Sequence, residues 1–155
     1  MTIQKRWALQ KAVVAHLQSE LAGQAIASED PDEMPGDIPV ETNVVETDVT
    51  EENHQLFVRL DGFGVSQRVG GAGHIDQYSF MAHVFCVDTA SDSDTIVDGA
   101  EEVARIQALV VAALDGWEPL EGASGIQHIS SNDAPDENPA THHGMCRFKV
   151  MISGG

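Results

Sequence analysis

Three side chains near the end of the chain are of types that bind zinc, namely His142, His143 and Cys146. Their spacing matches neither the HExxH pattern nor a triad of two histidines and one carboxylate. Adjacent residues of a strand also point to opposite faces of its sheet, so His142 and His143 could share one metal ion only across a bulge. The spacing therefore favours a surface histidine pair, and we expect no metal site.

Gly70, Gly71 and Gly73 resemble part of a phosphate-binding loop. Such a loop leads into a helix whose N-terminal amides face the phosphate, whereas this one leads into a strand pattern. No Lys-Ser or Lys-Thr pair follows it. We therefore interpret these glycines as the tip of a long hairpin and expect no nucleotide cofactor.

Four acids in one stretch, Asp88, Asp92, Asp94 and Asp98, suggest a calcium loop. Counted from Asp92, however, the position that requires glycine is occupied by Val97. The pattern therefore fails, and the acids are better explained as caps at the positive end of a helix.

Catalytic residues are not indicated elsewhere. Ser66, Ser79 and Ser130 lie in no nucleophile elbow, and no pair of carboxylates is singled out by its setting. We therefore expect no catalytic residue, no cofactor and no enzymatic activity. Trp117 and Met151 have two interpretations, as exposed anchors for a partner or as core residues beside a helix end.

Two helices are predicted from apolar periodicity. The first has the stripe Ile3, Trp7, Val14, Leu17 and Leu21, widened by Val13 and followed by Gly23 as a cap. The second follows the possible N-caps Ser91, Asp92 and Asp94, with apolar residues at Ile96, Ala100, Val103, Ile106, Val110 and Leu114. Asp115 and Gly116 end this second helix.

Strands are predicted from alternation of apolar and polar residues. Residues 56–61 form one strand, which residues 65–69 extend, and residues 78–87 form a central strand because they become apolar on both faces. Ile126 and Ile129 mark a short third strand, and residues 145–152 a last one. The order predicts an α+β fold, in which a small, mostly antiparallel sheet packs against two helices on one face.

Charge sets one segment apart from the rest. The chain has 8 Lys and Arg against 25 Asp and Glu, a formal charge of −17. Residues 28–53 contain ten of these acids, three prolines and no base, which favours an extended acidic arm ordered mainly by neighbours in an assembly. Only residues 40–49 could add a strand, at a sheet edge. We take residues 1–155 as a single domain that includes this arm.

Composition also excludes several classes of protein. An excess of negative charge repels phosphate, which excludes a conventional module for sequence-specific DNA or RNA binding. No apolar run reaches the ~18 residues of a membrane span, so we expect no membrane association and no export signal. Cys86 and Cys146 belong to no CxxC pair, and reduced thiols in a cytosol fit them best.

Four segments also carry a family resemblance. They are FVRLDGFGVSQR at residues 57–68, QYSFMAHVFCVDT at 77–89, EEVARIQALVVAALDGW at 101–117 and HHGMCRFKVMIS at 142–153. With the elements in this order, residues 3–23 and 54–153 resemble the tail terminator proteins of long-tailed double-stranded-DNA bacteriophages and gene transfer agents. These proteins are also called tail completion or head-to-tail joining proteins. The motifs are structural, and the arm at residues 28–53 is longer than the family would lead one to expect.

The resemblance implies a virion structural protein at the head-tail junction, assembled in the host cytoplasm. It implies a ring, commonly of six subunits, that caps the tail tube protein, stops tube polymerisation and contacts the head-completion or connector protein. Genomic DNA would pass through the lumen without sequence-specific binding. From the charge we infer that a negative lumen would keep the duplex from adhering. Two alternatives remain, a head-completion or neck protein of the same virion, and less favourably a small metal-binding enzyme.

The few bases are the natural candidates for subunit contacts, because six copies of a −17 chain repel one another. We therefore predict that the first helix and the hairpin form the interface; the alternative is that these bases are ordinary solvated charges, because exposed ion pairs contribute little. The bases proposed to meet acids of a neighbouring subunit or partner are Lys5, Arg6, Lys11, Arg59, Arg68, Arg147 and Lys149.

Overall fold

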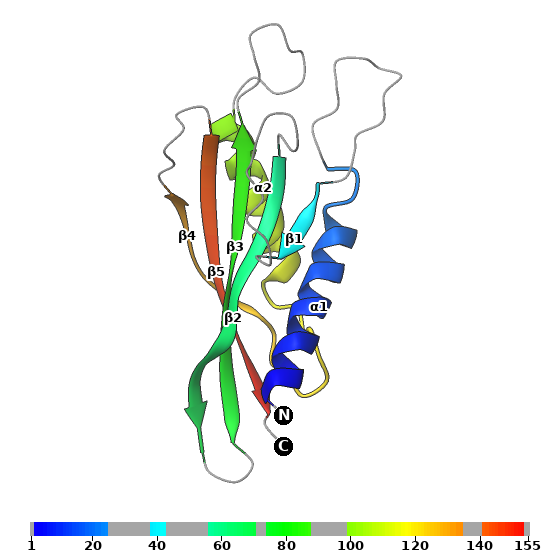
Figure 1. Ribbon diagram of the computed structural model, residues 1–155, viewed down its shortest axis with the longest axis vertical. Coiled ribbons are helices and arrows are strands. Elements are labelled where there is room, and N and C mark those ends of the chain that lie inside the picture. Colours follow the sequence, from blue (N-terminus) through cyan, green and yellow to red (C-terminus); the bar gives the residue numbers. More distant parts are fainter. Residues whose placement is uncertain are drawn as a thin grey trace, which may run out of the picture.

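The computed structural model describes residues 2–24, 38–42, 56–70, 74–87, 99–134 and 141–153. Within these ranges the elements are α1 (Thr2–Glu20), β1 (Val40–Thr42), β2 (Leu56–Val69), β3 (Ile75–Val87), α2 (Gly99–Leu114), β4 (Gln127–Ala134) and β5 (Thr141–Ser153). The expected α+β fold is confirmed, because both helices pack on one face of a mostly antiparallel sheet (Figure 1).

The sheet has the strand order β1-β2-β3-β5-β4. β3 lies in the middle, between antiparallel partners β2 and β5, which confirms its prediction as the central strand. β1 pairs in parallel with β2, Val40 opposite Val58, and is an edge strand as predicted. β4 forms the other edge and pairs with β5. The alternation of β3 and β5 places one row of side chains toward the helices and the other, which includes His83 and Arg147, on the face that neither α1 nor α2 covers, here called the open face.

The hairpin of β2 and β3 contains a bulge at Gly62. Asp61 pairs with Met81 and Gly64 with Ser79, so two residues of β2 oppose one residue of β3. Gly62 has φ 73°, the left-handed conformation that glycine adopts without a Cβ penalty. The extra residue reverses the alternation, and Phe63 therefore stacks on Phe80 of the core, with ring centroids 4.7 Å apart.

The first helix is confirmed, but the predicted apolar face is wrong in part. Its buried side chains recur every fourth residue, at Leu9, Val13, Leu17 and Leu21, each fully buried. Trp7, expected in the stripe, is 53% exposed. The helix has apolar residues on two adjoining sides, and packing against β1, β2 and α2 selects the side that carries Leu9. The side chain of Ile3 is outside the described part of the structure.

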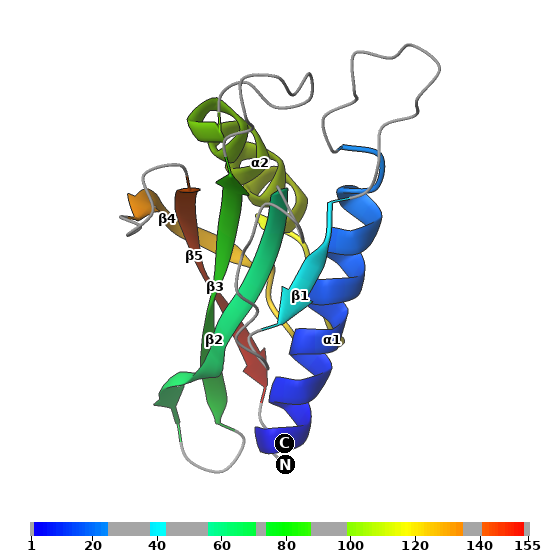
Figure 2. The same ribbon diagram turned by 45° about the horizontal axis from the view of Figure 1, so that its top comes forward.

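The second helix buries Val103, Ile106, Gln107, Val110 and Leu114 against β3 and β5. It ends as predicted, since Gly116 follows with φ 83°. Figure 2 shows α2 beside α1 on the same side of the sheet. Ala100, which was predicted on the apolar face of this helix, is exposed. Gln107 is buried on the side that faces the sheet, and its side-chain amide donates to the carbonyls of Asn132 and Met145, both at 3.3 Å.

The two carboxyl-terminal strands are longer than predicted. β5 begins at Thr141 instead of residue 145, and therefore includes both histidines of the proposed metal cluster. Ile126 is buried just before β4, but Ile129 lies at a register shift of the strand and is 53% exposed, so only the first isoleucine joins the core.

Several predicted features lie outside the described residues. They are the arm at residues 28–37 and 43–53, Gly71, Gly73, and the caps and acids at residues 88–98. The treatment of residues 1–155 as one domain stays a prediction for the same reason.

Candidate interaction surfaces

The seven predicted interface bases lie in three separate places on the structure. Lys5, Arg6 and Lys11 lie on α1, Arg68 lies near the tip of the hairpin, and Arg59, Arg147 and Lys149 lie on β2 and β5. The bases therefore define three candidate surfaces. These surfaces differ in whether their bases already form ion pairs or ring contacts within the chain.

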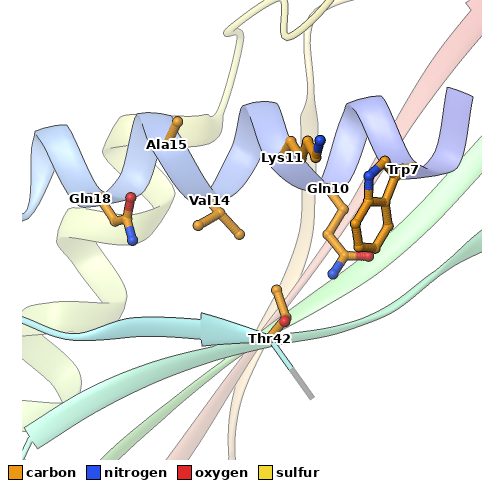
Figure 3. Close-up of a pocket in the computed structure, with 7 residues that line it drawn as sticks. All are labelled: Trp7, Gln10, Lys11, Val14, Ala15, Gln18 and Thr42. Carbon is orange, nitrogen blue, oxygen red and sulfur yellow. The ribbon is translucent and has the colours of Figure 1, made fainter. Parts of the chain in front are cut away.

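The first surface is a groove between α1 and β1, lined by Trp7, Gln10, Lys11, Val14, Ala15, Gln18 and Thr42, with a volume of about 300 Å³. Figure 3 shows Trp7, Gln10, Val14 and Gln18 extending from the helix toward the side on which Thr42 lies. Lys11 Nζ lies 5.5 Å from the Trp7 ring centroid, one helical turn away, as a cation–π pair. The groove is mainly apolar with a positive rim. It was missed because Trp7 was placed in the core.

The second surface is the hairpin end, where Val65, Val69 and Ile75 are 39%, 48% and 41% exposed. Arg68 pairs across the strands with Asp76, its Nε donating to Oδ1 at 2.8 Å. Asp76 has only 2% of its side chain exposed, whereas Arg68 has 50%. The hydrogen bonds from Arg68 hold the pKa of Asp76 below its ordinary value. The cation predicted for a neighbour is therefore already engaged in its own chain.

This ion pair predicts a dependence of stability on pH. The pKa of Asp76 is lower in the folded chain than in the unfolded chain, where it is ~3.9. The ion pair therefore contributes fully to the free energy of unfolding above pH ~3.9, and this contribution is lost as the pH falls through the folded pKa. We expect NMR titration to place the pKa of Asp76 below ~3.9. In Arg68→Gln it should rise to or above this value, since burial alone raises it. Arg147→Gln, remote from Asp76, is the control. An unchanged pKa of Asp76 in Arg68→Gln would contradict the assignment.

The third surface is the open face of the sheet. Arg59 lies over the rings of Phe57 and Phe85, with Cζ 5.5 Å and 5.6 Å from their centroids. Arg147 is exposed on the adjoining part of β5, and Lys149 is half-buried. Among the described residues this face thus combines aromatic rings with three of the predicted bases.

The open face also carries a cluster that sequence reasoning missed, made of Asp61, His83 and His143. His83 Nδ1 lies 2.7 Å from His143 Nε2 in a hydrogen bond, and His83 Nε2 lies 3.0 Å from Asp61 Oδ2. His143 stacks on Phe85 at 4.1 Å between ring centroids. The three residues come from three strands. The only sequence signal for the cluster was that the alternation of each strand places its residue on the same face of the sheet.

The three side chains considered above as possible zinc ligands, His142, His143 and Cys146, do not converge. Cys146 is buried among the residues that face the helices, where its sulfur accepts a hydrogen bond from Ser131 Oγ at 3.4 Å. Burial raises the pKa of its thiol. His143 lies on the opposite face, next to His83, and His142 lies near Ala100 and Val103 of α2. In the described ranges no three His, Cys, Asp or Glu side chains are grouped to hold a metal ion.

Trp117, for which two interpretations were open, packs against the core. Its ring stacks on His16 of α1 at 3.8 Å between centroids, and it contacts the buried cluster. This stack joins the end of α2 to α1. Trp117 therefore contributes to helix packing, and Trp7 is the more exposed tryptophan.

A second apolar groove lies between α2 and β4. Its lining consists of Ala104, Gln107, Ala108, Val111, Ala112 and Ser131, and its volume is about 440 Å³. Ala104, Ala108 and Ala112 are exposed and recur every fourth residue. Small side chains at this spacing form a shallow strip along α2 beside β4, whereas Trp7 lies at the groove beside β1, the other edge strand.

A fold of this kind occurs in a known particle. A chain of the structure titled "Virion of native gene transfer agent (GTA) particle" matches with a TM-score of 0.56 and 17% identity, over 74% of this chain and 78% of that chain. The match shows a shared fold. No protein-family model and no curated protein sequence matches the chain.

No helix in the described part of the chain is both long and apolar enough to cross a membrane. The exposed apolar residues are instead distributed over α1, the hairpin end and β4. They lie at the ends and edges of the sheet, which are the places where another folded chain can reach them.

Proposed function

We propose that this protein is a virion structural protein that assembles into a ring, with six subunits in the completed structure. The ring caps the tail tube, stops its polymerisation and joins the tail to the head connector. The observation that carries the proposal is the shared fold with a chain of the gene transfer agent virion particle. The resemblance of residues 57–68, 77–89, 101–117 and 142–153 to tail terminator proteins adds the specific role.

Two features of the described residues support a role in assembly. Apolar side chains are exposed at separate positions, Trp7 on α1 and Val69 and Ile75 on the hairpin. The cluster of Asp61, His83 and His143 is packed against Phe85 on a sheet face. We propose a binding function without catalysis and without a cofactor.

The proposed partners follow from the role. One side of the ring binds the tail tube protein and the other binds the head-completion or connector protein, while genomic DNA passes through the lumen without sequence-specific contacts. The net charge of −17 opposes adhesion of phosphate to the ring as a whole. In this proposal the protein lies at the head-tail junction of the virion.

Ring formation is testable with the purified full-length chain. We expect mass photometry and negative-stain microscopy to show closed rings, alone or on purified tail tubes, and tubes to stop elongating once capped. Raising salt from about 20 to 150 mM should increase the ring fraction. Salt weakens the repulsion between like charges more than ~10 Å apart more strongly than it weakens attraction between charges a few ångströms apart. Rings that bind portals instead of tubes would indicate the head-completion alternative.

The predicted interface bases need a selective test. Arg68→Glu would place two carboxylates together at Asp76 and weaken the fold itself, so Arg147 is the better position. If the bases of the open sheet face contact a neighbouring subunit, Arg147→Glu should reduce the ring fraction at a fixed concentration, and Arg147→Gln should have a smaller effect. A contact confined to the helix side of the sheet predicts no change in either variant. If both variants form rings and terminate tails normally, Arg147 lies outside the interface while the function is unaffected.

A further inference from the structure

We propose that neighbouring copies dock head to tail, with the groove between α1 and β1 of one copy against the groove between α2 and β4 of the next. This inference rests on the proposed function, because it needs the chain to assemble with itself. It goes further by naming the two surfaces that meet and the order in which they repeat.

The donor surface is the α1 groove with Trp7 at its edge. This indole is 53% exposed, yet it is held by the cation–π contact with Lys11, so it keeps a defined position at small entropic cost. Aromatic residues of this kind commonly provide most of the binding energy of an interface when a partner covers them. The neighbouring side chains of Val14 and Ala15 extend the apolar surface along the helix (Figure 3).

The acceptor surface is the groove that Ala104, Ala108 and Ala112 form with Val111 and Ser131. Its volume of about 440 Å³ exceeds that of the α1 groove, about 300 Å³. Alanine side chains let a second helix approach closely, which is how ridges of one helix enter grooves of another. The larger, shallower groove therefore suits the protruding indole of Trp7.

The two surfaces lie at opposite ends of the strand order. α1 packs on β1 and β2 at one edge, whereas α2 packs mainly on β5 and β3 and reaches β4 at the other edge (Figure 1). A contact between two different surfaces of the same chain is heterologous, and repeating it produces a ring or an open helix instead of a closed dimer. The placement of the grooves thus has the geometry that a ring requires.

Charge favours a second copy as the occupant. Residues 2–24 contain three bases and one acid, whereas three exposed acids lie around the second groove: Glu101 and Asp115, at helical spacing from Ala104, Ala108 and Ala112, and Asp133 on β4. Arg105 of α2 already binds Glu102 and the carbonyl of Gln24 within its own chain. Docking the α1 side on the α2 side therefore brings positive charge to negative charge in a chain that otherwise repels its copies.

The experiment uses single cysteines in the full-length chain. Gln10→Cys lies in the first groove and Ala108→Cys in the second, and the native Cys86 and Cys146 are both buried. Under mild oxidation we expect a mixture of the two variants to form crosslinked dimers, and each variant alone to form none. The double variant should give a ladder that ends at the ring. Ser79→Cys on the open sheet face, mixed with Gln10→Cys, is the matched control and should not crosslink.

A second variant checks the energetic role of the indole. Trp7→Ala should weaken assembly by about 10- to 100-fold in concentration, as expected for an interface hot spot, while Trp7→Phe retains most of it. Circular dichroism of each variant verifies that the exposed substitution leaves the fold intact. Wild-type affinity in Trp7→Ala would overturn the proposed interface.

The outcomes separate the interface from the function. Rings without the mixed crosslink, or Gln10→Cys that crosslinks with itself, overturn the head-to-tail interface and leave the capping role standing. A crosslinked ladder that binds no tail tube supports the interface and overturns the capping role. A monomer under all conditions, with no crosslink on tail tubes, overturns both.

Discussion

Replacing Phe148 by alanine is expected to lower the free energy of unfolding by about 3–5 kcal/mol. Phe148 is fully buried in β5 and stacks on Phe80 of β3 at 5.3 Å between ring centroids. Phe80 in turn stacks on Phe63, which the bulge at Gly62 directs inward. The three rings join the three longest strands, so the substitution leaves a cavity that neither neighbour can fill without giving up its own stack.

Urea unfolding followed by circular dichroism measures this effect. The comparison needs a protein concentration at which the chain is monomeric, because assembly adds to apparent stability. Ile129→Ala is the control, since this side chain is 53% exposed and should change stability by less than about 0.5 kcal/mol. A loss below ~1 kcal/mol for Phe148→Ala would show that the ring stack is not part of the cooperative core.

Substitution of Gly144 should have the second large effect. A Cβ at this position of β5 would lie 2.4 Å from Gln107 Nε2 and 2.7 Å from Val103 Cγ1 of α2. Gln107 cannot simply swing aside, because its amide donates to the carbonyls of Asn132 and Met145. We expect Gly144→Ala to cost about 1–3 kcal/mol through overpacking, and Gly144→Val to cost more.

The matched control is Gly64→Ala, also in a strand, where the nearest atom to a new Cβ is 3.9 Å away. This change should be neutral or slightly stabilising, because alanine reduces the entropy of the unfolded chain. Gln107→Ala should relieve part of the cost of Gly144→Ala, which a double-mutant cycle would show as coupling between the two sites. Independent, additive effects would mean that α2 does not rest on Gly144.

Local patterns were sufficient for most of the elements. The large apolar residues Val103, Ile106, Val110 and Leu114 recur at helical spacing, so they predicted both the helix and the face that packs on the sheet. The strand at residues 78–87 is apolar on both faces, which required a central position whatever the rest of the chain did. Gly116 marked the end of the second helix, because a glycine in the left-handed conformation lets the following N–H bond to a carbonyl of the last turn.

The face of α1 was decided by tertiary packing. Trp7 and Leu9 are two residues apart and therefore point to nearly opposite sides of this helix, and hydrophobicity alone favours the larger tryptophan. The structure buries Leu9 with Val13 and Leu17, because this four-residue row fits against β1, β2 and α2. Trp7 is therefore left at the surface, where it forms the edge of the proposed interface.

The side-chain clusters were also decided by tertiary structure, through strand register. Arg68 meets Asp76, and His83 meets both Asp61 and His143, only because particular residues of different strands lie opposite or diagonal to each other. A shift of one residue would move each partner to the other face, and the bulge at Gly62 introduces such a shift within β2. Sequence alone determines the types of residue that are present and their periodicity. Register, which depends on contacts between segments far apart in the chain, determines which of them come together.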